Sequence, residues 1–106
     1  MDSFAPIGPA VVTKEDIEDP HNLNLSCMVN GEVKQNSNTR HFVFGVDFVV
    51  SWVSQFSTLL PGDIILTGTP GGVGNNMKPK QFLKVGDVVE CRVEGIGSVV
   101  NKNFNI

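Results

Sequence analysis

Beyond the midpoint of the chain stands the stretch Ile64-Ile65-Leu66-Thr67-Gly68-Thr69-Pro70-Gly71-Gly72-Val73-Gly74, where an apolar run changes abruptly into hydroxyl residues, a proline and glycines. Residues 64–66 are β-branched or leucine, which predicts a buried strand. The glycines and Pro70 then prevent regular structure and let a second molecule approach the backbone closely. Two threonine hydroxyls and free N–H groups at the end of a strand suit recognition of a carboxylate or another oxyanion. A tight turn that needs glycine for its backbone angles is the alternative interpretation.

The composition around this stretch is that of an ordinary globular protein. The chain has 106 residues, of which 41% are hydrophobic and 18% charged, and this predicts one domain with a modest core over residues 1–106. A net charge of −3 argues against a nucleic-acid surface, which needs clustered Lys and Arg. No apolar run approaches the roughly 20 residues that span a bilayer, and no secretory signal is visible. We therefore expect no nucleic-acid partner, no membrane partner, and a cytoplasmic or mitochondrial location.

Strands are predicted on both sides of the stretch. Apolar and polar residues alternate over residues 23–29, which is typical of a half-buried strand. Asn30-Gly31 follows and predicts a tight hairpin, with a return strand over residues 32–36. A second alternation, over residues 89–93, predicts another strand, and after a glycine turn the chain returns as a last strand over residues 98–104.

One helix is predicted ahead of the stretch, over about residues 46–60. Apolar side chains recur there at helical spacing: Val46, Val49, Val50, Val53, Phe56 and Leu60. Valine favours strand, but the period of 3.6 persists over more than three turns, Asp47 suits a first turn, and Pro61-Gly62 suits an end. We expect the valine stripe and Trp52 to belong to the core. The expected fold class is thus α+β and β-rich, with one main helix.

Several familiar kinds of chemical site can be excluded from the residues alone. The run Gly71-Gly72-Val73-Gly74 is no P-loop, because no Gly-Lys-Ser/Thr follows it, and no serine lies in a G-x-S-x-G elbow. His21 and His41 have no evident catalytic partner. The acidic residues of 15–19 are expected to stay solvated at a short helical turn rather than bind a metal.

The two cysteines, Cys27 and Cys91, occupy apolar-phase positions of predicted strands. This favours small buried thiols in a reducing compartment. No second Cys or His lies at zinc-ligand spacing from either of them.

A set of short motifs runs in one order along the chain. They are Phe4-Ala5-Pro6-Ile7-Gly8-Pro9, Val12-Thr13-Lys14-Glu15-Asp16-Ile17, Asp19-Pro20-His21-Asn22-Leu23, Val29-Asn30-Gly31-Glu32, Gln35, Asn38-Thr39, Ser54-Gln55-Phe56, Pro61-Gly62-Asp63, Leu66-Thr67-Gly68-Thr69-Pro70, Phe82-Leu83-Lys84-Val85-Gly86-Asp87-Val88-Val89 and Glu94-Gly95-Ile96-Gly97. Each motif is weak alone. In this order and spacing they resemble, over nearly the whole chain, the C-terminal part of the fumarylacetoacetate hydrolase family, and within it the fumarylacetoacetate hydrolase domain-containing proteins.

The resemblance implies part of that family's mixed β-sandwich roll and of its active site. Its enzymes cleave or decarboxylate small oxo-acids, including acylpyruvates and oxaloacetate, with Mg²⁺ or Mn²⁺ held by two glutamates and an aspartate. Those ligands, an E-x-E pair and a later Asp, together with an active-site Lys, precede the F-x-P-x-G-P segment in the family. The Lys position falls before Met1, and no E-x-E occurs in this sequence. The chain is therefore expected to lack the N-terminal metal-ligand portion, and no metal ligand or catalytic residue is assigned.

What carries over is substrate binding by the Thr-Gly-Thr-Pro loop. The resemblance implies that Thr69, the second threonine, contacts the substrate carboxylate, with Thr67 beside it and with Gly68 and Pro70 shaping the wall of the pocket. Part of a roll leaves strand edges or apolar faces uncovered, so we expect either a homodimer, as is usual in the family, or association with the missing portion.

Three hypotheses for function remain open. The chain is a piece of a metal-dependent hydrolase or lyase, a non-catalytic remnant that serves as a binding or partner module, or an unrelated small β protein. An E-x-E and a later Asp encoded in frame upstream of Met1 would favour the first hypothesis over the second.

Overall fold

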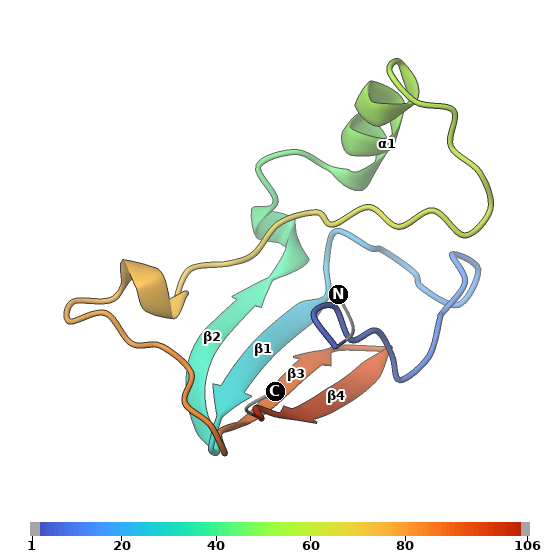
Figure 1. The fold of residues 1–106 in the computed structure, drawn as a ribbon. Coiled ribbons are helices and arrows are strands. Elements are labelled where there is room, and N and C mark those ends of the chain that lie inside the picture. Colours follow the sequence, from blue (N-terminus) through green and yellow to red (C-terminus); the bar gives the residue numbers. More distant parts are fainter. Residues whose placement is uncertain (1–2, 105–106) are drawn as a thin grey trace.

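The computed structural model describes residues 3–104, which form one antiparallel sheet and one projecting helix (Figure 1). The elements in chain order are β1 (Asn24–Val29), β2 (Glu32–Asn38), the 3₁₀ helix η1 (Thr39–His41), α1 (Val46–Ser54), the 3₁₀ helix η2 (Gly74–Asn76), β3 (Val88–Val93) and β4 (Gly97–Lys102). The four strands lie in the order β2-β1-β3-β4. This arrangement confirms the predicted β-rich α+β class. None of the helices in residues 3–104 is long and apolar enough to cross a membrane.

The hairpin between β1 and β2 forms where Asn30-Gly31 predicts it. Asn30 and Gly31 have φ values of 51° and 82°, the left-handed conformations that a two-residue type I′ turn requires. The Asn30 side chain also donates to the Asp87 carboxylate over 2.8 Å and accepts from the Val88 amide over 2.9 Å. The turn is therefore tied to the start of β3. The return strand β2 runs two residues beyond its predicted end, to Asn38.

The predicted buried strand at residues 64–66 is wrong. This segment belongs to no strand, and Ile64 and Leu66 are 63% and 87% exposed. A strand forms only when its backbone groups pair with those of a neighbour, and nothing within residues 3–104 pairs with this segment.

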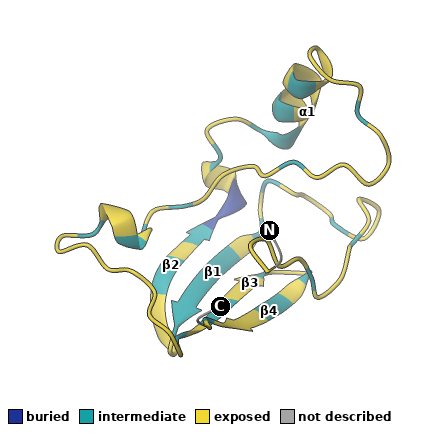
Figure 2. Cartoon of the chain, in the orientation of Figure 1, coloured by how far each residue is buried: buried dark blue, intermediate teal, exposed yellow. Residues whose placement is uncertain are grey.

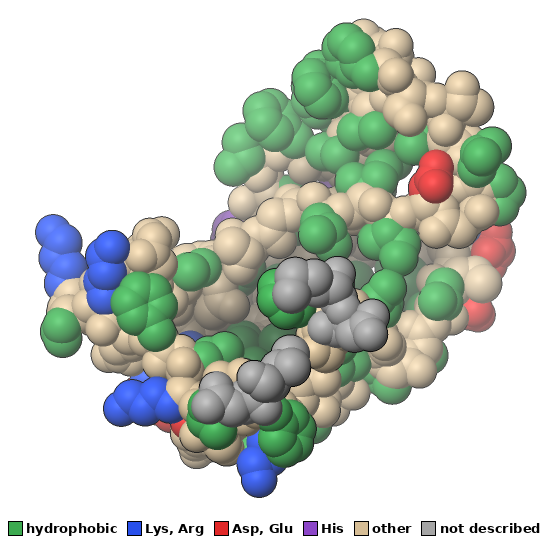
Figure 3. Space-filling view, viewed as in Figure 1, with side chains coloured by type: hydrophobic (Ala, Val, Ile, Leu, Met, Phe, Trp, Pro, Cys, Tyr) green, Lys and Arg blue, Asp and Glu red, His purple; other side chains and the backbone are tan. Residues whose placement is uncertain are grey.

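The helix is confirmed, but it is shorter than predicted and its core role is wrong. It ends at Ser54, and it projects away from the sheet instead of covering it (Figure 1). Trp52 is 53% exposed, and hydrophobic side chains gather on the surface around α1 (Figure 3). A helix buries its apolar stripe only against a second layer, and the valine-rich sequence extends no further without such packing.

Hydrophobic side chains are nowhere fully buried in residues 3–104. The buried residues there are Asn38 and Thr39, where β2 meets η1 (Figure 2). Both are hydrogen-bonded: Asn38 donates to the Asn24 side chain over 2.9 Å, and Thr39 accepts from the Leu23 amide over 2.9 Å. The predicted modest core is thus wrong for the chain alone.

Self-association is the expected consequence in solution. Exposed apolar patches of this extent mark interaction surfaces, so light scattering at high concentration should give a mass well above the 11.5 kDa of one chain. Trp52→Glu should shift the equilibrium toward smaller species if the α1 face carries the contact. A monodisperse monomer at high concentration would contradict the expectation.

Candidate functional site

The Thr-Gly-Thr-Pro loop lies beside β2, on the chain segment that returns from α1 (Figure 1). Gln35 of β2 fixes it there, since its Nε2 donates to the Thr69 hydroxyl over 2.9 Å and to the Pro70 carbonyl over 2.8 Å. A carbonyl oxygen only accepts hydrogen bonds, so the Gln35 amide must present its nitrogen to the loop. The sequence indicates Gln35 only as one matching motif position, because no spacing rule links it to a loop more than 30 residues away.

The Thr69 hydroxyl is exposed and keeps its own hydrogen for another molecule. It accepts from Gln35, and its contact with the Pro70 carbonyl is 3.5 Å long, which is too long for a strong O–H···O bond. A hydroxyl that already accepts one bond can still donate one. The side chain can therefore donate a hydrogen bond to another group on the open side of the loop. Thr67 and Gly68 are also exposed, and Pro70 is half-buried.

Two glycines of the loop are required by close approach of backbone. Gly72 has a φ of +104°, and a Cβ there would collide with the Lys34 carbonyl oxygen of β2. A Cβ at Gly74 would collide with the Gln81 carbonyl oxygen, while the Gln81 amide donates to the Gly74 carbonyl over 2.9 Å. The loop thus lies against β2 on one side and against the following segment on the other.

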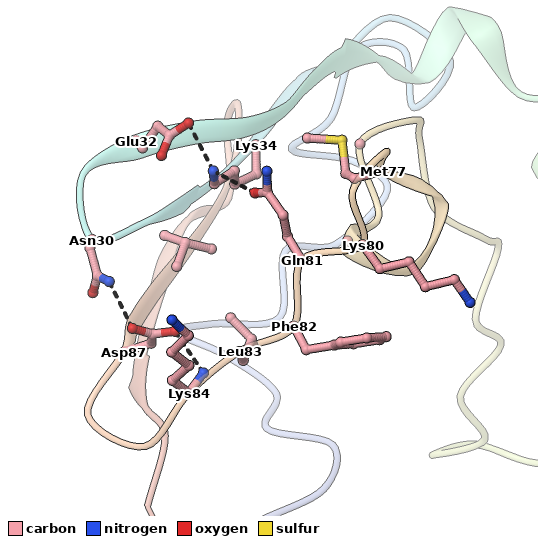
Figure 4. A pocket seen from close by; sticks show the side chains of 13 residues that line it. Asn30, Glu32, Lys34, Met77, Lys80, Gln81, Phe82, Leu83, Lys84 and Asp87 are labelled. Carbon is pink, nitrogen blue, oxygen red and sulfur yellow. Dashed lines mark hydrogen bonds and ion pairs between the residues drawn. The ribbon is translucent and has the colours of Figure 1, made fainter.

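A pocket of about 500 Å³ adjoins the loop at Gly72 and Gly74, without Thr69 in its lining (Figure 4). Its lining contains one ion pair. The Lys34 ammonium lies 2.8 Å from the Glu32 carboxylate and donates to the Gln81 side chain over 3.1 Å. The ammonium groups of Lys80 and Lys84, also in the lining, form no ion pair with a described residue.

Asp87, at the other side of this pocket, is a capped carboxylate. The backbone N–H of Lys84 donates to it over 2.7 Å, and the Asn30 amide donates over 2.8 Å. These two bonds, with the Lys84 bond the stronger cause, hold the pKa of Asp87 below its ordinary value. Its role is to join the β1–β2 turn to the start of β3.

Each histidine contacts a polar group of another residue in the chain. The Nε2 atom of His21 accepts from the Val46 amide over 2.9 Å and so positions the start of α1. His41 lies 3.3 Å from the Ser37 hydroxyl. Residues 3–104 contain no group of three or more His, Cys, Asp or Glu that could hold a metal ion. The Mg²⁺ or Mn²⁺ that the resemblance implies therefore has no ligand set in this part of the chain.

Comparison with known proteins gives consistent results. The family model described as fumarylacetoacetate (FAA) hydrolase C-terminal matches residues 1–103. The mitochondrial oxaloacetate tautomerase Fahd2a of Rattus norvegicus is 58% identical over 102 residues, which are 96% of this chain and 33% of that protein. The mitochondrial oxaloacetate tautomerase FAHD2A of Homo sapiens is 55% identical over 96% of this chain and 32% of its own length. The chain thus spans about a third of the length of the curated relatives it matches.

Solved structures agree with the fold. Fumarylacetoacetate hydrolase from Exiguobacterium antarcticum superposes with a TM-score of 0.94 at 42% identity, covering 100% of this chain and 38% of that one. Maleylpyruvate hydrolase from Sphingobium sp. SYK-6, in complex with manganese(II) ion and pyruvate, gives a TM-score of 0.88 at 33% identity, covering 97% of this chain and 36% of that one.

Proposed function

This chain belongs to the fumarylacetoacetate hydrolase family, and we propose that it supplies the Thr-Gly-Thr-Pro wall of the pocket in a family enzyme that acts on small oxo-acids. The observation that carries the proposal is the double hydrogen bond from Gln35 to Thr69 and Pro70. It holds the Thr69 hydroxyl in place with its hydrogen free for a substrate carboxylate. Gly68 and Pro70 shape the backbone of this wall, and Thr67 lies next to it.

The proposed reaction class follows the names of the relatives. Several are oxaloacetate tautomerases, which favours interconversion of the keto and enol forms of oxaloacetate. Acylpyruvate hydrolysis and oxaloacetate decarboxylation use the same substrate class, a small acid with a carboxylate beside a carbonyl. In each case a fixed hydroxyl that binds the carboxylate orients the carbon that reacts. The relatives' names also favour a mitochondrial location, with a cytoplasmic one as the alternative.

A divalent metal belongs to the proposed enzyme but not to residues 3–104. The manganese and pyruvate in the maleylpyruvate hydrolase structure favour Mg²⁺ or Mn²⁺ as cofactor. Because the described residues offer no ligand set, we propose that the ligands come from elsewhere in the polypeptide or from another chain. The chain would then be a partial C-terminal domain, completed by that portion and by formation of a homodimer. Carboxylate binding by Thr69 is independent of where the metal is held.

A non-catalytic binding or partner module of the same fold is the second candidate. The missing ligand set in residues 3–104 is the observation that favours it. Coding sequence upstream of Met1 discriminates between the two, since an in-frame E-x-E pair with a later Asp belongs to the enzyme alone.

Thr69→Ala in the full-length context tests the proposed site. It should leave the fold intact and lower oxaloacetate turnover between several-fold and about a hundredfold, because a lost hydrogen bond costs about 0.5–1.5 kcal/mol, or up to about 3 with a charged partner. Thr69→Ser keeps the hydroxyl and should retain most activity. Thr58→Ala is the matched control, an exposed threonine outside the loop. Unchanged kinetics for Thr69→Ala would remove Thr69 from the site.

A further inference from the structure

The two cysteines lie directly opposite each other in the middle of the sheet. Cys27 of β1 is the register partner of Cys91 of β3, and both are free thiols. Their sulfur atoms are 3.6 Å apart. Cys27 is half-buried and Cys91 is exposed, so the prediction of two buried thiols is wrong for Cys91. Strand pairing brings together two residues that are 64 positions apart in the chain.

The pairing is of the kind in which opposite side chains approach most closely. Backbone hydrogen bonds run from the Glu94 amide to the Asn24 carbonyl and from the Asn30 amide to the Val88 carbonyl, each over 2.8 Å. Hydrogen-bonded and non-hydrogen-bonded pairs alternate along antiparallel strands, which makes Cys27 and Cys91 a non-hydrogen-bonded pair. Such pairs have Cα atoms about 4.5 Å apart, within the range of about 4.4–6.8 Å found for disulfides. Rotation of the side chains can therefore close the bond without a change of register.

We propose that Cys27 and Cys91 form a redox-modification site, a dithiol that a low-molecular-weight disulfide oxidises to an intrachain disulfide between β1 and β3. In the first step the sulfur of one cysteine attacks one sulfur of the oxidant. A mixed disulfide forms, and the other half of the oxidant leaves as a thiol that takes up the cysteine's proton. In the second step the remaining cysteine attacks the protein sulfur of the mixed disulfide, which releases the second small thiol with the second proton. The protein loses two hydrogens and the oxidant gains two.

The surroundings of the two thiols set the order of these steps. Burial, and to a smaller extent the neighbouring Cys91 thiol, raises the pKa of Cys27 to about 11. The groups that face Cys27 are the Gln35 amide from β2 and the Cys91 thiol from β3, with Leu25 and Val29 along its own strand face, and none of them is charged. Since the thiolate is the nucleophile, the exposed Cys91 should react first and Cys27 should close the ring. Cys27 remains buried after Cys91 has reacted, so its pKa stays above the neutral range. The rate of ring closure should therefore rise about tenfold for each unit by which the pH is raised through the neutral range, because the thiolate fraction of Cys27 rises by that factor.

The test incubates the protein, in its full-length context, with glutathione disulfide at several ratios to reduced glutathione, under native conditions and in denaturant. Intact mass and peptide mapping then follow the products. We expect the native chain to lose two hydrogens and to give a linked Cys27–Cys91 peptide. The ring should form at a ratio of reduced glutathione to glutathione disulfide at least about tenfold higher than the ratio at which it forms in denaturant, because strand pairing raises the effective concentration of the thiols.

Single variants separate the two steps. Cys27→Ser should stop at a glutathione adduct on Cys91, and Cys91→Ser should react more slowly and also form no ring. The proposal is overturned if the native chain accumulates stable adducts without ring closure. Equal ring formation in native and denatured chains would also overturn it, since the strand pairing would then contribute nothing.

Discussion

Gly72→Ala should displace the Thr-Gly-Thr-Pro loop from β2 and lower the free energy of unfolding by about 3 kcal/mol or more. Two independent causes act together. The φ of +104° is a conformation that L side chains rarely adopt, and the new methyl group would collide with the Lys34 carbonyl. Backbone cannot yield as a flexible side chain does, so the loop must move. Urea unfolding monitored by circular dichroism measures this loss of unfolding free energy. Hydrogen exchange at the Gln35 side-chain amide reports whether its bonds to the loop persist.

Gly71→Ala is the matched control for this change. Gly71 precedes Gly72 directly, its φ is not positive, and a Cβ there meets open space among the described residues. The same added methyl group should therefore change stability by no more than about 0.5 kcal/mol. If the two variants behave alike, close packing of the loop on β2 is not what Gly72 provides.

Local chemistry made part of this fold predictable from sequence. Asn30-Gly31 forms its hairpin because the two residues themselves favour positive φ, whatever surrounds them. The helix follows from a period of apolar residues, and α1 begins at Val46 as that period predicts. Its burial does not follow, because the period shows which face is apolar but not whether a second layer covers it. The prediction of a strand at residues 64–66 is wrong for the same reason. A strand forms only beside a pairing neighbour, and its own sequence does not show whether such a neighbour is present.

The candidate site was predictable only in its outline. Motif order pointed to Thr69 and its loop, whose role in substrate binding stays a prediction. Gln35, which holds that wall, lies on another element, and only the three-dimensional structure brings its amide to the loop. The same holds for Cys27 and Cys91. The alternation of apolar and polar residues around each of them predicted a strand, but it did not predict that the two strands are neighbours.

Gln35→Glu should impair the proposed enzyme more than Thr69→Ala does, while β2 remains intact. The change conserves shape but replaces two N–H donors with acceptor oxygens that face the Pro70 carbonyl and the Thr69 hydroxyl. The carboxylate repels the Pro70 carbonyl and draws the Thr69 hydrogen away from the substrate. Together these effects cost about 2–4 kcal/mol, which corresponds to a drop in kcat/KM of roughly 30-fold to 1000-fold. Carbonyl oxygens nearby raise the pKa of the new carboxyl above its usual 4.3 or so, so lowering the pH should restore one O–H donor and part of the activity.

Steady-state kinetics of oxaloacetate turnover in the full-length context, over a range of pH, measure both effects. Gln55→Glu adds the same charge at the exposed end of α1 and should change little.

The double variant Gln35→Glu with Thr69→Ala distinguishes positioning from a separate role. If Gln35 acts through Thr69, removing the hydroxyl takes away much of what Gln35 contributes, and the two losses in kcat/KM should combine to less than their product. Fully multiplicative losses would mean that Gln35 supports turnover by another route, such as the Pro70 carbonyl alone. The acid rescue provides a second criterion. It should weaken when Thr69 is absent, because a protonated carboxyl then has no hydroxyl to hold, whereas a general effect on stability would leave the rescue unchanged.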